Sequence, residues 1–91
     1  MAYLETDIIR ISDTVLSSQL GNESVILDHK HGQYFGLDNV GSFVWELIQE
    51  KEMTVAEIKV AILEEFEIDK NTAQTDLEIL FAQLKEEQLI L

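Results

Sequence analysis

Residues 33–48 read QYFGLDNVGSFVWELI, and the spacing of the apolar residues changes partway along this stretch. Residues 33–37 are largely apolar and aromatic and follow a glycine, which is typical of a β-strand. After Asp38, apolar residues recur at the i, i+3, i+4, i+7 and i+8 spacing of a helix; they are Val40, Phe43, Val44, Leu47 and Ile48. Asp is a preferred N-cap residue, so we expect a strand that passes directly into a helix at Asp38.

The residues before this stretch predict two further strands. Residues 14–20 partly alternate, Gly21 and Asn22 tolerate the positive φ of a tight turn, and residues 24–28 are rich in β-branched side chains. His31 and Gly32 predict a second tight turn before residue 33. Residues 7–11 predict an additional short edge strand. The pattern indicates an antiparallel meander of three main strands.

The residues after this stretch predict two more helices. Thr54 and Glu57 form a capping box, and Asp69 is a candidate N-cap for the last helix. The apolar stripes expected on these helices are Val55, Ile58, Ile62 and Phe66, then Ala73, Leu77, Leu80, Phe81 and Leu84. We expect residues 89–91 to dock on the core. Segregated strands and helices predict an α+β fold, with a three-stranded antiparallel sheet packed on three helices.

Length and charge exclude several classes of protein. A chain of 91 residues suggests a single domain over residues 1–91, with its core at about residues 14–90. It has no cysteine, so disulfides and thiol chemistry are excluded. A net charge of −12 disfavours nucleic acids and anionic membranes as partners. No apolar run is long enough to span a bilayer, and residues 1–11 lack a signal-peptide core, so we expect a cytoplasmic protein.

Candidate catalytic and metal-binding residues do not form a site in the sequence. His29 and His31 have no third ligand at a useful spacing, so we expect a solvated hairpin tip rather than a metal site. Ser42 lacks the glycine pattern of a nucleophile elbow, and no phosphate-binding glycine motif is present. Trp45 is expected to fill the core beside Gly41. We therefore expect no enzymatic activity, no cofactor and no metal.

The predicted strand at residues 33–37 is expected to lie at an edge of the sheet. Natural edge strands are usually protected by Lys, Pro or a bulge, and this one has none of these except Gly36. A glycine within a strand often marks a bulge or a close approach by another backbone. Asp76, at the margin of the last helix's apolar stripe, is either an exposed helix residue or a charge beside a groove. The sequence thus favours an edge open to a partner.

The central stretch also resembles a known family. From Tyr34 to Leu47 the chain follows the pattern Tyr-x-x-Leu-(Asn/Asp)-x-x-Gly-x-x-(Ile/Val)-Trp-x-Leu of the PqqD-like proteins. The resemblance extends over roughly residues 14–90. The family often has Asp-Gly after the first helix, where this chain has residues 50–52 (EKE), and often Gly where Gln88 stands.

The resemblance implies a winged helix-turn-helix-like RiPP recognition element, a domain that binds the leader segment of a ribosomally made precursor peptide. The leader would add a strand to residues 33–37 and settle against the last helix. It implies these leader-binding residues: Gln33, Tyr34, Phe35, Gly36, Leu37, Ala73, Asp76, Leu77, Leu80, Phe81, Gln83 and Leu84. The side chains of those residues that belong to the last helix would line pockets that give specificity. Replacing Phe35 by Pro is then expected to abolish binding.

Three partner assignments remain open. The stand-alone format resembles the leader-binding proteins of split lasso-peptide systems, which hand the precursor to a cysteine-type leader peptidase and an ATP-dependent cyclase. A similar format serves pyrroloquinoline quinone synthesis, where the partner is a radical-SAM enzyme. A winged helix that binds nucleic acid is the alternative from another class. It is disfavoured because the last helix offers Lys70 and Lys85 against five carboxylates: Asp69, Asp76, Glu78, Glu86 and Glu87.

Overall fold

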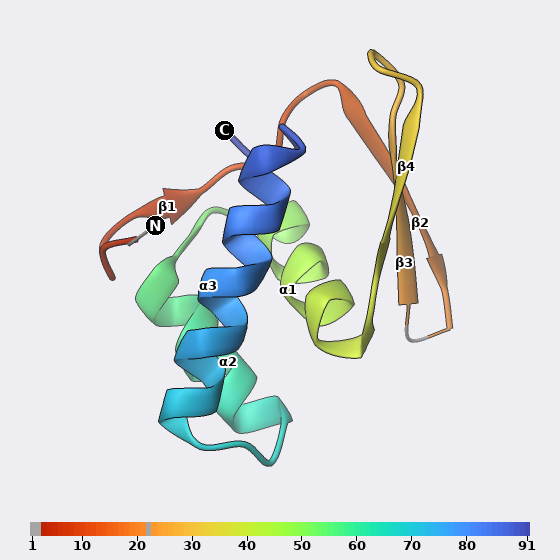
Figure 1. Ribbon diagram of the computed structural model, residues 1–91. Helices are drawn as coiled ribbons and strands as arrows, with labels where there is room; N and C mark the ends of the chain where they lie inside the picture. Colours follow the sequence, from red (N-terminus) through yellow and green to blue (C-terminus); the bar gives the residue numbers. More distant parts are fainter. Residues whose placement is uncertain (1–2, 22) are drawn as a thin grey trace.

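A three-stranded antiparallel sheet stands beside three helices in the computed structural model, which describes residues 3–21 and 23–91 (Figure 1). The strands β2 (Val15–Leu20), β3 (Glu23–Asp28) and β4 (Gln33–Leu37) follow one another in space as they do in the chain. This confirms the predicted meander. Of the predicted turn, Asn22 lies outside the described residues, and Gly21 has a φ of 65°.

The three helices begin where the cap residues predict. They are α1 (Asn39–Glu50), α2 (Val55–Glu65) and α3 (Lys70–Glu86). Asp38 accepts a hydrogen bond from the Gly41 N–H at 2.8 Å, and Thr54 forms a capping box with Glu57. Asp69 accepts from the Thr72 N–H at 2.7 Å. Each cap satisfies an N–H group that the first turn leaves unpaired, so these short side chains fix where the helices start.

The chain termini are tied to the helices by short pairings. β1 (Ile8–Ile9) pairs with β5 (Met53–Thr54), directly before α2. The strand expected within residues 7–11 is therefore present, but it does not extend the three-stranded sheet. β5 was not predicted, because a strand of two residues has no alternation of side chains that could be recognised in the sequence. Leu89 and Ile90 are 2% and 3% exposed, and Ile90 pairs with Ile11, so these two residues dock on the core as expected. Leu91 is 69% exposed, so its expected docking was wrong.

The core lies between one face of the sheet and the three helices. Ile26 of β3, Trp45 of α1, Ile62 of α2 and Phe81 of α3 are each at most 1% exposed. Trp45 is thus a core residue, as predicted. A Cβ added at Gly41 would meet atoms of Leu37 and Asp38 at 3.3 Å, so Gly41 allows the start of α1 to pack against the end of β4.

The end of α3 explains one departure from the family pattern. Gln88 stands where the family often has Gly, and its φ is 61°. The left-handed conformation that glycine adopts easily is therefore kept with a larger side chain. The Leu89 N–H donates to the Leu84 carbonyl at 2.8 Å, which closes the helix. Among the described residues, no helix has the length and apolar character needed to cross a membrane.

Candidate functional site

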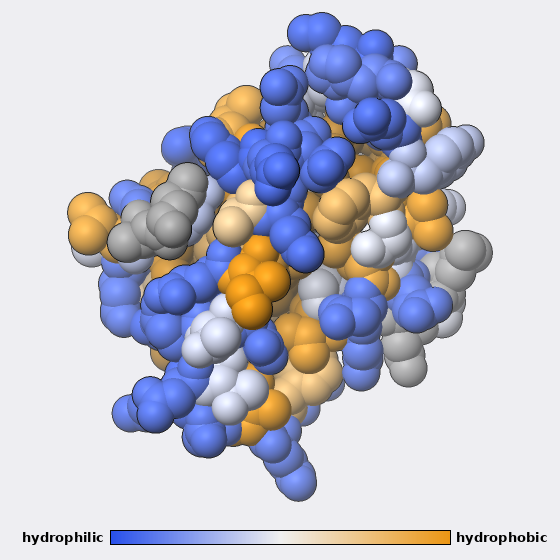
Figure 2. Space-filling view, in the orientation of Figure 1, coloured by the Kyte–Doolittle hydropathy of each residue, from blue (hydrophilic) through white to orange (hydrophobic). Residues whose placement is uncertain are grey.

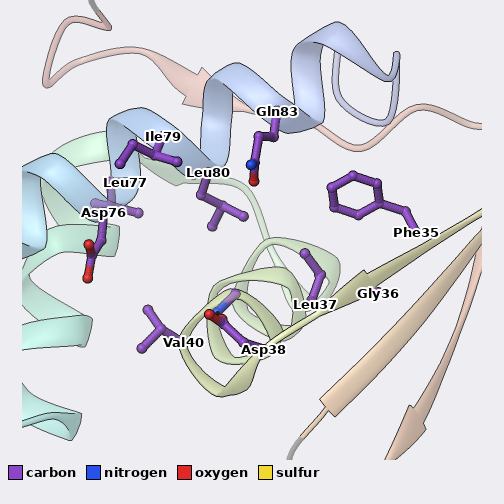
Figure 3. A pocket seen from close by; sticks show the side chains of 11 residues that line it. Phe35, Gly36, Leu37, Asp38, Val40, Asp76, Leu77, Ile79, Leu80 and Gln83 are labelled. Carbon is purple, nitrogen blue, oxygen red and sulfur yellow. Dashed lines mark hydrogen bonds between the residues drawn. The ribbon is translucent and has the colours of Figure 1, made fainter.

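A groove of about 330 Å³ separates β4 from α3. β4 forms one wall, α3 the other, and the first residues of α1 contribute to its lower end. Its lining residues are Phe35, Gly36, Leu37, Asp38, Val40, Gly41, Asp76, Leu77, Ile79, Leu80 and Gln83. Leu37 and Leu80 approach the same space from opposite walls (Figure 3). On the face shown in Figure 2, apolar surface is exposed along α3 and between α3 and the sheet.

The strand register shows which backbone groups of β4 lack a partner in the sheet. Leu20 and Glu23 pair across a two-residue connection, and such a connection closes on a pair that exchanges both backbone hydrogen bonds. Because bonding direction alternates along a strand, the even-numbered residues of β3 bond toward β4. Their partners are residues 33, 35 and 37. The N–H and C=O groups of Tyr34 and Gly36 therefore point to the free edge.

The two faces of β4 have different surroundings. Phe35 and Leu37 turn toward the helices, and Leu37 is 6% exposed. Tyr34 is 74% exposed on the opposite face. The register is continuous through Gly36, so there is no bulge, and no atom lies within 4 Å of the position its Cβ would take. The close approach expected at Gly36 is thus not made by any described part of this chain.

The last helix divides the predicted site residues into two sets. Asp76, Leu80 and Gln83 lie on the side of α3 that lines the groove, and Leu77 reaches it from the margin of the core. The remaining three predicted residues are buried in the core and do not line the groove: Ala73, Phe81 and Leu84. Their predicted place in the pocket was wrong. They follow the buried stripe of the helix, and the groove-lining residues lie about one position, or 100°, around it.

The groove includes residues that the sequence analysis did not assign to the binding site. Asp38, Val40 and Gly41 line it because α1 begins directly under the end of β4, and Ile79 lines it from the rim of α3. Ile79 is 54% exposed, and an exposed large aliphatic residue on an otherwise polar helix face was the available signal. Asp76 lies on the same side of Leu80 as Val40, away from Phe35 (Figure 3).

The β3–β4 turn carries the two histidines. His31 Nδ1 lies 2.6 Å from Asp28 Oδ2, and the backbone N–H groups of Lys30 and His31 donate to Asp28 Oδ1. The hydrogen bond from the His31 ring, helped by those N–H groups, holds the pKa of Asp28 below its ordinary value. Within the described part of the chain, no three potential ligands gather as a metal site would require.

Comparison with known families decides the assignment. The family model described as "Coenzyme PQQ synthesis protein D (PqqD)" matches residues 23–90. The chain belongs to the PqqD family. The matched region begins with β3 and includes β4, all three helices and both walls of the groove, so the likeness seen between Tyr34 and Leu47 is confirmed over most of the chain.

Two solved structures share the fold of this PqqD family member. One, described as "TbiB1 in Complex with the TbiA(beta) Leader Peptide", is 38% identical; the alignment covers 89% of this chain and 93% of that one, with a TM-score of 0.83. The other, "Lasso peptide synthetase B1 complexed with the leader peptide", is 23% identical, covers 91% and 96%, and has a TM-score of 0.77; it is compared for its fold alone. None of the curated protein sequences matches this chain.

Proposed function

We propose that this protein binds the leader segment of a ribosomally synthesised precursor peptide and has no catalytic role of its own. The leader adds as a strand to the free edge of β4, beside α3. The observation that carries the proposal is the pairing of an open edge with a groove: Tyr34 and Gly36 direct two N–H and two C=O groups toward a space walled by Leu37 and Leu80. Support comes from TbiB1, which is 38% identical and is described in complex with a leader peptide.

Affinity and selectivity then have different origins. Any extended peptide can form the backbone hydrogen bonds to Tyr34 and Gly36, so these bonds provide affinity without selecting a particular sequence. Alternate leader side chains point into the groove, where Leu37, Leu77 and Leu80 favour apolar residues at every second position. The intervening side chains point outward beside Tyr34. The expected leader motif is therefore an extended segment with two or more apolar residues spaced by two.

The leader is best assigned to a lasso-peptide precursor. The relative with 38% identity is TbiB1, and the second structure, matched by fold, is named lasso peptide synthetase B1. In this setting the protein presents the precursor, in the cytoplasm, to a cysteine-type leader peptidase and then to a cyclase. A role in pyrroloquinoline quinone synthesis, beside a radical-SAM enzyme, is the second candidate, and the family description favours it. The cognate precursor distinguishes the two.

The direct test is a titration of isotope-labelled protein with a synthetic leader peptide, taken from the precursor gene beside this one. We expect amide shift changes at Gln33–Leu37 and along α3 from Asp76 to Gln83. Hydrogen exchange provides a sharper readout. Binding should slow exchange at the Tyr34 and Gly36 amides most, because the amides of residues 33, 35 and 37 already bond to β3.

A peptide of the same composition in scrambled order is the control. Selective protection of Tyr34 and Gly36 by the leader, and not by the scrambled peptide, would support strand addition. Shift changes confined to β2, or saturating binding with no change in exchange at Tyr34 and Gly36, would contradict it.

A further inference from the structure

Gly36 is a glycine that the described fold does not require. It lies inside β4, where the pairing with β3 continues without a bulge. Its φ is not positive, unlike those of Gly21 and Gly32, and no described atom lies within 4 Å of the position that a Cβ would take. Because glycine inside a strand is destabilising relative to alanine, the sheet would be at least as stable with a side chain at this position.

Gly36 interrupts an apolar surface on the outer face of the sheet. The register places three residues in one row across the strands: Leu16, Leu27 and Tyr34. The next row on the same face is Ser18, Val25 and Gly36. Tyr34 is 74% exposed, on the side of the sheet that faces away from the helices, and Val25 is partly exposed. With only a glycine beside it, Val25 is uncovered toward the free edge of β4.

A leader strand at the free edge of β4 extends this second row by one residue. The backbone groups of Gly36 point to that edge, so one leader residue pairs with Gly36, and its side chain stands on the outer face. It alternates with the side chains that enter the groove and is therefore not one of them. Neighbouring strands lie about 4.8 Å apart, so its Cβ lies roughly 9.6 Å from the Cβ of Val25.

The width of this gap favours an aromatic side chain. Apolar side chains are in contact only when their heavy atoms come within about 4.5 Å, so a leucine on the leader is too short to reach Val25. An aromatic ring is long enough, and such rings stabilise β-sheets by lying across a glycine of the neighbouring strand. They also pair favourably with β-branched residues. A methionine is as long but loses more conformational freedom when it is ordered.

We infer that the leader carries an aromatic residue that pairs with Gly36 and packs across it against Val25. The inference rests on the proposed function and specifies its ligand further. Besides the apolar residues that enter the groove, the recognised segment has a Phe, Tyr or Trp on the opposite face of the extended strand. Gly36 then determines specificity, because a larger side chain at this position would occupy the space of the ring.

The test combines a substitution at Gly36 with single replacements in the peptide. Gly36→Val keeps the N–H and C=O groups at the free edge and places a side chain where the ring would lie. Ser18→Val makes a similar change on the far side of Val25 and is the matched control. The probe is the synthetic leader of the precursor gene beside this one, with each Phe, Tyr or Trp replaced in turn by Leu. Isothermal titration calorimetry gives the affinities.

We expect one replacement by Leu to weaken binding to the unmodified protein and to Ser18→Val by about fivefold, and to leave binding to Gly36→Val unchanged. A second measurement uses the unmodified protein alone. The ring current of the leader residue should shift the methyl resonances of Val25, and the same peptide with Leu at that position should not. This measurement decides whether the contact exists even if Gly36→Val binds no leader.

The contrary outcomes separate the inference from the proposed function. The inference is disproved, while leader binding stands, if the bound leader has no aromatic residue or if no replacement weakens binding. Equal losses in all three proteins, or Val25 methyl resonances that do not respond to the ring, would disprove it too. If the unmodified protein binds no leader, the proposed function fails as well.

Discussion

The two edges of the three-stranded sheet are alike in sequence and different in surroundings. Neither β2 nor β4 contains Lys or Pro, so both leave backbone groups unprotected. β4 faces a groove with apolar residues on the opposite wall. β2 lies among polar groups: Ser17 accepts a hydrogen bond from Gln49 at 2.7 Å, and Gln19 lines a polar depression with Glu46. We therefore expect peptide selectivity at the β4 edge, where α3 supplies a second wall, and not at the β2 edge.

Proline substitution should distinguish the free edge of β4 from that of β2 most clearly. Tyr34→Pro removes an N–H that faces the free edge of β4, and the exposed Tyr34 side chain leaves the core intact. We expect leader affinity to fall at least about twentyfold, since a backbone hydrogen bond is lost and the ring obstructs the incoming strand. Isothermal titration calorimetry with the synthetic leader peptide measures this loss.

Two variants serve as controls for that experiment. Tyr34→Ala keeps the N–H and should retain most of the affinity. Gln19→Pro removes the equivalent N–H from the free edge of β2, because residues 16, 18 and 20 bond toward β3. It should leave binding unchanged. If Gln19→Pro abolished binding and Tyr34→Pro did not, the leader would belong to the β2 edge instead.

The groove wall is the next difference to test. Leu80→Ala removes apolar surface opposite Leu37 and should weaken leader binding by about tenfold, because a partly exposed leucine gains burial when the groove is filled. Val60→Ala shortens an aliphatic side chain on α2 that is 56% exposed and lies away from the groove. It should bind the leader normally. Equal losses in the two variants would show that α3 does not form the second wall.

Local rules predicted the elements, whereas packing set the details of the site. Asp38, Thr54 and Asp69 mark helix starts because capping acts within one turn, so these starts were readable from the sequence. Which face of α3 meets the groove depends on how the helix rotates against the sheet. A stripe of leucines does not reveal that rotation, and for this reason Phe81 and Leu84 were assigned to the pocket and lie in the core.

The bonding direction of individual strand residues was also not readable from the sequence. The expectation that Phe35→Pro would act on the leader was based on strand position alone. In the structure Phe35 pairs with Ile26 and its N–H points toward β3, so that substitution would damage the sheet rather than the free edge. Once the register is known, the residue to replace by proline is Tyr34, one position earlier in the strand. A one-residue difference reverses both the side-chain face and the bonding direction.

Charge at the acidic end of the groove should have a smaller effect than its wall. Asp76→Lys reverses an exposed charge, so binding of a leader with Lys or Arg near this position should weaken by about fivefold at low salt and less at high salt. Glu64→Lys makes the same change on the exposed side of α2 and is the matched control. If the two variants have equal affinities at every salt concentration, Asp76 has no specific role.

The two hairpin turns differ in how they are fixed, and this difference predicts a small effect of pH on stability. Each turn has a glycine at positive φ, Gly21 and Gly32, and the β3–β4 turn is held in addition by the buried Asp28. The pKa of Asp28 is lowered in the folded protein, chiefly by the hydrogen bond from His31. Its contribution to stability is therefore fully present above the ordinary value of 3.8 and is lost as pH falls through the lower folded value.

Asp28→Asn should unfold at a lower urea concentration than the unmodified protein at pH 6. The difference between the two urea midpoints should narrow below pH 3.8. A gap that stays constant down to pH 2.5, about one unit below the ordinary value, would mean that the ionised carboxylate does not hold this turn.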